Sequence, residues 1–197
     1  MTEIIVFLSV TLDGVMQGPG RPDEDRRGGF KRGGWAAPYA DEETGKLAAE
    51  GMQTTGSMLL GRRTYEDLLP QWNKAGGPFK DMLNGMPKYV VSRTLKEPLP
   101  WPNSTLLGGE LTKAVAKLRK KDDRDIVILG SGAVVRKLLA KRLVDQLILL
   151  IHPLILGDGQ RLFDDTGPDA VFELAGTRTT TTGVIAATYR KTDRGPK

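Results

Sequence analysis

The sequence contains no cysteine and only one histidine among its 197 residues. The absence of cysteine excludes disulfide bonds, thiolate catalysis and zinc sites built on sulfur. The single histidine, His152, leaves too few ligands for a histidine-based metal centre, so we expect no bound metal. A Ser-His-Asp triad would have to use this residue. Because His152 follows an apolar segment and precedes Pro153, a structural position at a strand end is the favoured interpretation.

Long apolar runs are also missing from the sequence. None reaches the roughly 18 residues that a membrane-spanning helix needs. The first ten residues are partly apolar, but they include Glu3 and lack a basic region and a small-residue cleavage site. They therefore indicate a first strand rather than a signal peptide, and we expect a cytoplasmic protein.

The composition that remains is that of a soluble globular protein, with 39% hydrophobic and 27% charged residues. The length fits one domain, which we expect to span residues 1–192, with a frayed tail at 193–197. The formal net charge of +5 suits an anionic ligand such as a phosphorylated cofactor. Solubility alone is the simpler explanation of that charge.

Short apolar segments alternate with amphipathic segments along the chain. Strands are predicted at 4–10, 57–60, 89–92, 105–107, 126–129 and 147–151, and helices at 41–54, 64–69, 110–121 and around 134–139. Pro70 is expected to end the second helix. Residues 171–190 predict a β-hairpin broken at Gly183, with the four threonines 179–182 in its first arm. This order predicts an α/β fold with a mostly parallel sheet and an antiparallel edge.

Residues 17–38 form a long polar segment that is rich in glycine, proline and arginine. A loop of this length inside a compact domain is usually functional or disordered. Trp35 and Tyr39 at its far end indicate that it packs back onto the body of the protein. The lysine-rich stretch 113–124 could bind nucleic acid, but a solvated helix face explains it better because no recognised binding motif accompanies it.

Two glycine turns carry the functional argument. Leu59-Leu60-Gly61-Arg62-Arg63-Thr64 and Ile128-Leu129-Gly130-Ser131-Gly132-Ala133 each place glycine between a strand and a helix. Such turns can bind anions through amide groups at a helix N-terminus, at the strand ends where α/β proteins bind ligands. Each turn alone is more often ordinary turn chemistry, and neither a Walker motif nor G-x-G-x-x-G is present. Together with a third strand end, Ser92-Arg93, they could hold a long, charged cofactor.

The order of these motifs resembles the dihydrofolate reductase family. More closely, it resembles the reductase (RibD C-terminal) domain of bacterial riboflavin biosynthesis proteins and its stand-alone relatives. The resemblance covers nearly the whole chain and rests on the following segments: Ser9–Gly14, Leu59–Glu66, Lys88–Thr94, Ile128–Ala133, Ile151-His152-Pro153, Leu156–Gly159 and Arg161–Phe163.

The resemblance implies a dihydrofolate reductase-like three-layer fold and NADPH as cofactor. It also implies hydride transfer to a small heterocyclic or phosphoribosylamino-pyrimidine substrate, whose phosphate the basic loop 21–34 could meet. Carried over residue by residue, the resemblance assigns Val10 and Val15 to the nicotinamide, Gly61, Arg62 and Thr64 to the diphosphate and adenosine side, Ser92 and Arg93 to the 2′-phosphate, and Gly130, Ser131, Gly132 and Ala133 to the second phosphate turn. Arginine suits a phosphate because its charge is permanent and its geometry is forked.

The catalytic acid remains unassigned. Dihydrofolate reductases place one carboxylate early in the first helix, and Asp41, Glu42 and Glu43 open that helix here. Helix capping explains these acids equally well, and Asp13 in Leu-Asp-Gly is favoured as a turn former. A dihydrofolate or pterin reductase and a non-catalytic nucleotide-binding protein on the same fold therefore remain as alternatives. Members of the family often pair, which makes a homodimer possible.

Overall fold

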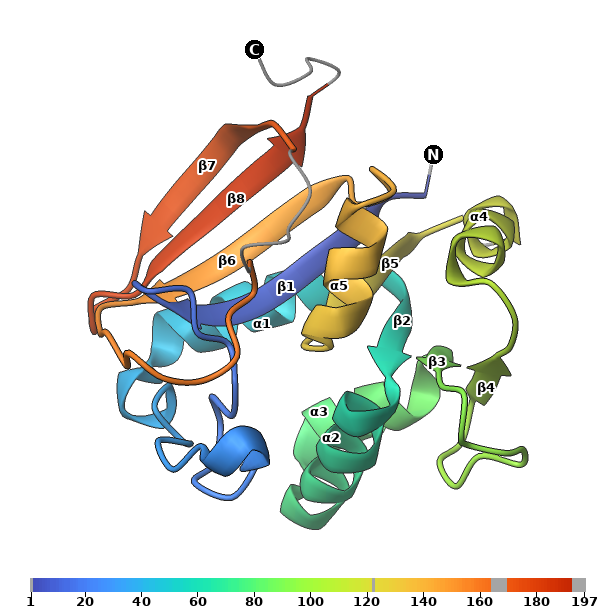
Figure 1. Ribbon diagram of the computed structural model, residues 1–197, viewed down its shortest axis with the longest axis horizontal. Helices are drawn as coiled ribbons and strands as arrows, with labels where there is room; N and C mark the ends of the chain where they lie inside the picture. The colour runs from blue at the N-terminus through green and yellow to red at the C-terminus, as the bar shows by residue number, and fades with distance from the viewer. Residues whose placement is uncertain (1, 122, 164–169, 193–197) are drawn as a thin grey trace.

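Eight strands form one sheet in the order β4-β3-β2-β5-β1-β6-β8-β7 (Figure 1). The computed structural model describes residues 2–121, 123–163 and 170–192, so the tail expected at 193–197 lies outside the described residues. The strands are β1 (Ile4–Thr11), β2 (Thr55–Gly61), β3 (Lys88–Val91), β4 (Ser104–Leu107), β5 (Asp125–Leu129), β6 (Gln146–His152), β7 (Phe172–Thr179) and β8 (Ile185–Lys191). The helices are α1 (Glu42–Thr54), α2 (Arg62–Ala75), α3 (Gly77–Gly85), α4 (Leu111–Lys121) and α5 (Gly132–Leu139).

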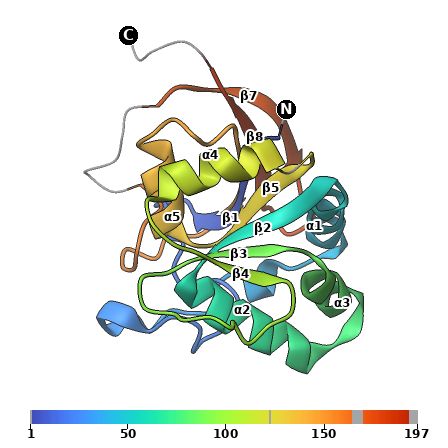
Figure 2. The ribbon, with the colours of Figure 1, turned by 90° about the vertical axis from the view of Figure 1, so that its right-hand side faces the viewer.

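The first six strands run parallel to their neighbours, and β8 and β7 continue the sheet in antiparallel pairing. This arrangement confirms the expected mixed sheet with an antiparallel C-terminal hairpin. Helices cover both of its faces, with α4 and α5 on one side and α1 on the other (Figures 1 and 2).

Alternation of side chains along the strands builds two cores. In β2, Leu59 packs with Val135 and Leu138 of α5 in one cluster. Its neighbours Met58 and Leu60 pack on the opposite face with residues of α2 and α3. Each fully buried side chain of this size contributes about 1.5–3 kcal/mol to folding. The cores thereby hold helices on both sides of the same strand ends.

The expectation that Pro70 ends the second helix is wrong, because α2 continues through it. Proline removes one helical hydrogen bond and costs about 3 kcal/mol in a helix interior. Packing outweighs this cost: Tyr65 and Leu69 are fully buried. Beyond the proline, the Trp72 ring contacts Phe79 of α3 at a centroid distance of 4.4 Å.

Helix α3 is not expected from the sequence, because its Gly-Gly-Pro start is typical of a loop. A buried lysine stabilises the C-terminal end of α3. The Lys88 ammonium group, which is fully buried, donates to the carbonyls of Leu83 at 2.5 Å and Met86 at 2.7 Å. Burial lowers the pKa of Lys88 to about 8. Lys88 therefore supplies the donors that the last carbonyls of α3 lack.

The C-terminal hairpin differs from expectation in its turn. Thr179 ends β7, whereas residues 180–182 form the turn to β8 instead of lying in the first arm. The carboxylate of Asp41 explains the difference, because it accepts hydrogen bonds from the backbone amides of Thr181 and Thr182. A contact 140 residues away in the sequence thus outweighs the β-propensity of threonine.

The long loop 17–38 is ordered around one buried side chain. The Gln17 side-chain amide donates to the carbonyls of Asp25 at 3.2 Å and Arg27 at 3.0 Å. The backbone carbonyl of Gln17 accepts a hydrogen bond from the Trp35 indole at 2.8 Å. Trp35 and Tyr39 both contact the ring of His152, which confirms that the end of the loop packs back onto the body.

Among the described helices, none is long and apolar enough to cross a membrane. Across the same part of the chain, no three His, Asp or Glu side chains gather as metal ligands would.

Candidate cofactor site

The carboxyl ends of β2, β3 and β5 meet at one edge of the sheet. β2 lies between the other two strands and runs parallel to both. At these strand ends lie residues 61–64, 92–93 and 130–133, the segments that the sequence predicts to act together. In α/β proteins, ligands bind outside such strand ends.

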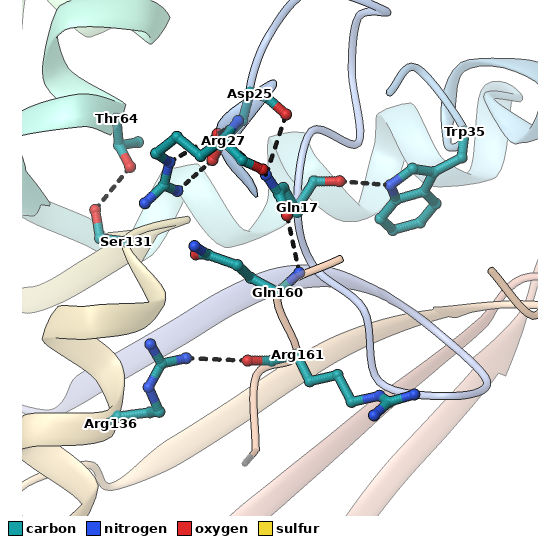
Figure 3. A network of polar contacts seen from close by, with 9 residues as sticks. All are labelled: Gln17, Asp25, Arg27, Trp35, Thr64, Ser131, Arg136, Gln160 and Arg161. Carbon is teal, nitrogen blue, oxygen red and sulfur yellow. Dashed lines mark hydrogen bonds and ion pairs between the residues drawn. The ribbon is translucent and has the colours of Figure 1, made fainter. Parts of the chain in front are cut away.

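Hydrogen bonds join the two glycine turns. The Gly61 amide donates to the Ser131 hydroxyl at 2.7 Å. This hydroxyl donates to the Thr64 hydroxyl at 2.8 Å (Figure 3). Gly130 and Ser131 both have left-handed backbones, with φ of 65° and 60°. Left-handed φ at a residue other than glycine costs about 1–2 kcal/mol. At Ser131 this strain is offset by the hydrogen bonds of its hydroxyl, which links the two turns.

The third strand end is tied to the first turn. The Arg62 guanidinium donates to the Thr94 hydroxyl at 2.6 Å and to the Glu66 carboxylate at 2.9 Å. The Ser92 hydroxyl accepts from the amides of Thr94 and Leu95 and so shapes the turn after β3. Arg93 is exposed. All three predicted segments are therefore brought together.

The loop after β1 lies against the second glycine turn. A Cβ at Gly132 would lie 1.9 Å from the Met16 Cε atom, so Met16 covers this glycine closely. Val10 and Val15 are buried, and Val15 pairs with Arg161 in an isolated bridge. The two valines assigned to the nicotinamide thus flank a loop that touches the turn.

Several polar contacts near these turns are not predicted from the sequence (Figure 3). The Gln17 side-chain carbonyl accepts from the Gln160 amide at 2.9 Å. The Arg136 guanidinium donates to the Arg161 carbonyl at 3.0 Å. The first contact joins residues 143 positions apart. No local pattern in the sequence signals either one.

Asp13 is a fixed acceptor beside this loop. Its carboxylate accepts from the Thr11 hydroxyl at 2.6 Å and from the amides of Leu156 and Gly157 at 3.2 and 2.8 Å. These bonds, led by that from Thr11, lower the pKa of Asp13 to about 2. A carboxyl group held ionised in this way is a poor proton donor, which agrees with its interpretation as a turn former.

The acidic side chains at the start of α1 also have hydrogen-bond or ion-pair partners within the chain. The Asp41 carboxylate caps the helix through the Thr44 amide at 2.8 Å and binds the Thr181 hydroxyl at 2.7 Å. These contacts, led by that with Thr181, hold the pKa of Asp41 well below its usual range. Glu42 and Glu43 both pair with Lys46 at 2.9 Å. The capping interpretation therefore accounts for these three acids.

His152 lies in an aromatic cluster. The residue is 3% exposed, and its ring meets Trp35 and Tyr39 edge-on, at centroid distances of 5.1 and 5.6 Å. Its Nδ1 atom lies 3.0 Å from the Leu150 carbonyl. Burial lowers the pKa of His152. These contacts agree with a structural position at the end of β6.

Comparison with solved structures defines the fold class. The chain is similar to a candidate riboflavin biosynthesis protein from Shewanella sp. PV-4, with 21% identity, a TM-score of 0.71 and coverage of 97% and 99% of the two chains. It is similar to a pyrimidine reductase-like protein from Corynebacterium diphtheriae, with 14% identity, a TM-score of 0.63 and coverage of 98% and 93%. A third neighbour is dihydrofolate reductase from Enterococcus faecalis complexed with NADP(H), with 15% identity, a TM-score of 0.62 and coverage of 97% of each chain. The fold is that of dihydrofolate reductase.

The family follows from the sequence. Residues 2–186 match the RibD C-terminal domain family, and the chain belongs to it. It is also 28% identical over 193 residues to the uncharacterized protein YyaP of Bacillus subtilis, with coverage of 94% of this chain and 93% of YyaP. The resemblance drawn from the motifs is confirmed.

Proposed function

We propose that the protein is an NADPH-dependent reductase that transfers a hydride to a small heterocyclic substrate of the phosphoribosylamino-pyrimidine class. The observation that carries the proposal is the hydrogen-bonded junction of the turns after β2 and β5, which Arg62 extends to the end of β3. Membership of the RibD C-terminal domain family supports a reductase of the riboflavin-biosynthesis type. The neighbour complexed with NADP(H) supports the choice of cofactor.

The residues at the junction fit a phosphorylated dinucleotide. Gly130 lets the two turns pack closely, because a Cβ there would lie 3.2 Å from the Thr64 side chain. The N-terminus of α5, which follows this turn, is the kind of position where a phosphate binds. Arg62 and Arg93 are exposed cations at neighbouring strand ends. Arg93 has the forked geometry that distinguishes a 2′-phosphate from a hydroxyl. The cofactor-binding residues that we propose are Val10, Val15, Gly61, Arg62, Thr64, Ser92, Arg93, Gly130, Ser131, Gly132 and Ala133.

The chemistry divides between cofactor and protein. Bound NADPH would supply the hydride, and the chain would orient the reactants and exclude water. Val10 and Val15 are buried, so they would pack behind the nicotinamide position, and Met16 lies against Gly132. The hydroxyls of Thr64 and Ser131 fix the distance between the two turns.

The acids of α1 favour the pyrimidine class over folate. Folate reduction in this fold uses a carboxylate early in the first helix, but Asp41 is the helix cap and Glu42 and Glu43 pair with Lys46. We propose that the exposed cations Arg26 and Lys31 of the long loop meet a substrate phosphate.

Titration with NADPH and NADH tests the cofactor. We expect clearly tighter binding of NADPH, and equal weak binding of the two would defeat the proposal. Turnover is then measured by NADPH oxidation with 5-amino-6-(5-phosphoribosylamino)uracil and, separately, with dihydrofolate. We expect oxidation with the pyrimidine only. Binding of NADPH without turnover on either substrate would favour the non-catalytic alternative.

Three further properties stay predictions of the sequence: a single domain over residues 1–192, a cytoplasmic location and a homodimer.

A further inference from the structure

Helix α2 begins with cations, although the N-terminus of a helix favours anions. Arg62 and Arg63 are its first two residues, and its first turn contains no acid. Its N-cap residue, Gly61, has no side chain that could accept from the free amides. The partial positive charge at a helix N-terminus makes this placement unfavourable unless an anion lies nearby. Departures of this kind from a local rule are expected at functional sites.

One acid, Glu66, lies a helical turn further along and contacts Arg62 from one side. Both oxygens of its carboxylate accept from the Arg62 Nε atom, at 2.9 and 3.0 Å. A terminal nitrogen of the same guanidinium donates to the Thr94 hydroxyl at 2.6 Å. Within the described residues, no carboxylate accepts from either terminal nitrogen of Arg62. Glu66 therefore holds the Nε side of the guanidinium and leaves the edge formed by the terminal nitrogens directed at the turn after β3.

The turn after β3 carries further groups that suit a phosphate. The hydroxyls of Ser92 and Thr94 lie 3.4 Å apart, and Arg93 is exposed beside them. A phosphate monoester carries about 1.5 to 2 negative charges at neutral pH, so it is best neutralised by two cations. Arg62 and Arg93 supply two, from neighbouring strand ends. The free edge of Arg62 can bind such a group through two parallel hydrogen bonds.

The pair between Arg62 and Glu66 contributes little to the stability of the fold. Its side chains are 47% and 43% exposed, and exposed ion pairs are weak. An order with the cation N-terminal to the acid is also the less favourable one on a helix. The effect of the pair is on orientation instead. A free arginine side chain loses much rotamer entropy when it binds a ligand, whereas one already held in place loses less.

We propose that Glu66 is a positioning residue for the 2′-phosphate of the cofactor, because it holds Arg62 through Nε with both terminal nitrogens available. The inference rests on the proposed function, since NADPH carries that phosphate and NADH does not. The carboxylate of Glu66 also repels a phosphate. Because Glu66 is exposed, water and salt weaken this repulsion, and the orientation of Arg62 has the larger effect.

Calorimetric titration of the full chain with NADPH and NADH tests this function of Glu66. Glu66→Ala removes the acceptor for Nε, so NADPH affinity should fall about fivefold, the upper end of what an exposed ion pair contributes. NADH affinity should not change. Glu66→Gln keeps an oxygen that accepts from Nε and removes the negative charge. This variant should bind NADPH at least as tightly as the native chain, a rescue that loss of charge alone would not give.

Two further variants isolate the contact with Arg62. Glu66→Ala should cause no additional loss of NADPH affinity when it is combined with Arg62→Ala. Glu50→Ala is the matched control, because Glu50 is also an exposed acid paired with an arginine, Arg178 at 2.7 Å, and it should change neither affinity. Circular dichroism checks the fold of each variant.

The outcomes separate this inference from the proposed function. A native chain that does not prefer NADPH would defeat both. A native preference that Glu66→Ala leaves intact, an equal fall with Glu66→Gln, or a rise in NADPH affinity with both variants would overturn the positioning function of Glu66 alone. An equal loss of NADH affinity in Glu66→Ala would also overturn it.

Discussion

Two regions of the molecule use hydroxyl and charged side chains to different ends. At the N-terminus of α1, the Asp41 carboxylate satisfies Thr44 and the turn between β7 and β8. At the ends of β2 and β5, Ser131 and Thr64 join two turns while Arg93 stays exposed. The first region uses its polar groups to hold the fold. The second holds its shape with a few hydrogen bonds and leaves a cation exposed beside it, as the proposed cofactor site requires.

Among the variants that distinguish the two regions, Arg93→Ala should have the largest effect, which is a loss of NADPH affinity. A charge-assisted hydrogen bond to phosphate contributes about 1.5–3 kcal/mol, so NADPH affinity should fall roughly 10- to 100-fold. NADH affinity should stay nearly constant, because NADH lacks the 2′-phosphate. Calorimetric titration measures both. Lys120→Ala, at the opposite end of the strands, is the matched control and should change neither affinity. An equal loss for both cofactors would indicate general damage to the fold.

Acidification should lower the stability of the fold, because it protonates Asp13. The folded-state pKa of this carboxyl is about 2, against 3.8 without its partners. Its contribution of about 2 kcal/mol is therefore present above pH 3.8 and is lost as the pH falls towards 2. Urea unfolding at pH 6 and pH 3 should show this loss in the native chain. Asp13→Asn should be less stable at pH 6 and should lose less on acidification; an unchanged acid response would contradict the assignment.

Asp41→Ala should separate fold from function. Loss of the helix cap and its contacts with the hairpin turn should lower the free energy of unfolding. NADPH affinity should not change, because none of the proposed cofactor residues contacts this carboxylate. Asp41→Asn keeps part of the cap and should lose less. A fall in NADPH affinity with unchanged stability would contradict this prediction and would indicate that α1 forms part of the cofactor site.

Ser131→Ala should have the smallest effect on stability and should still weaken cofactor binding. The variant loses the hydroxyl that links Gly61 to Thr64, which costs about 1 kcal/mol. It should also weaken NADPH binding, since the turns are no longer joined. Denaturant unfolding and titration measure the two effects. Ser104→Ala, on the edge strand β4, should change stability little and NADPH binding not at all.

Sequence patterns predict the regular elements and the strand ends well, because both depend on local periodicity. The convergence of residues 61–64, 92–93 and 130–133 follows once the strands are parallel, since parallel strands share a carboxyl edge. Helix α3 and the passage of α2 through Pro70 could not be predicted, because packing between Trp72 and Phe79 overrides the local signals.

The contacts that shape the site depend on distant residues. Gln17 meets Gln160, and Asp41 meets Thr181, each across about 140 positions. A single sequence carries no signal for such pairs. The sequence leaves the function of Asp41 open for the same reason: a capping acid and a catalytic acid look alike until the turn that binds the carboxylate is known.

Amide chemical shifts of the isotope-labelled protein, measured during NADPH addition, test the central claim most directly. The account predicts that the largest changes fall on Gly61, Ser92, Arg93 and residues 130–133, with little change at Asp41 and Thr181. Shifts that cluster around α1 and the hairpin turn, while the three strand ends stay unchanged, would contradict it.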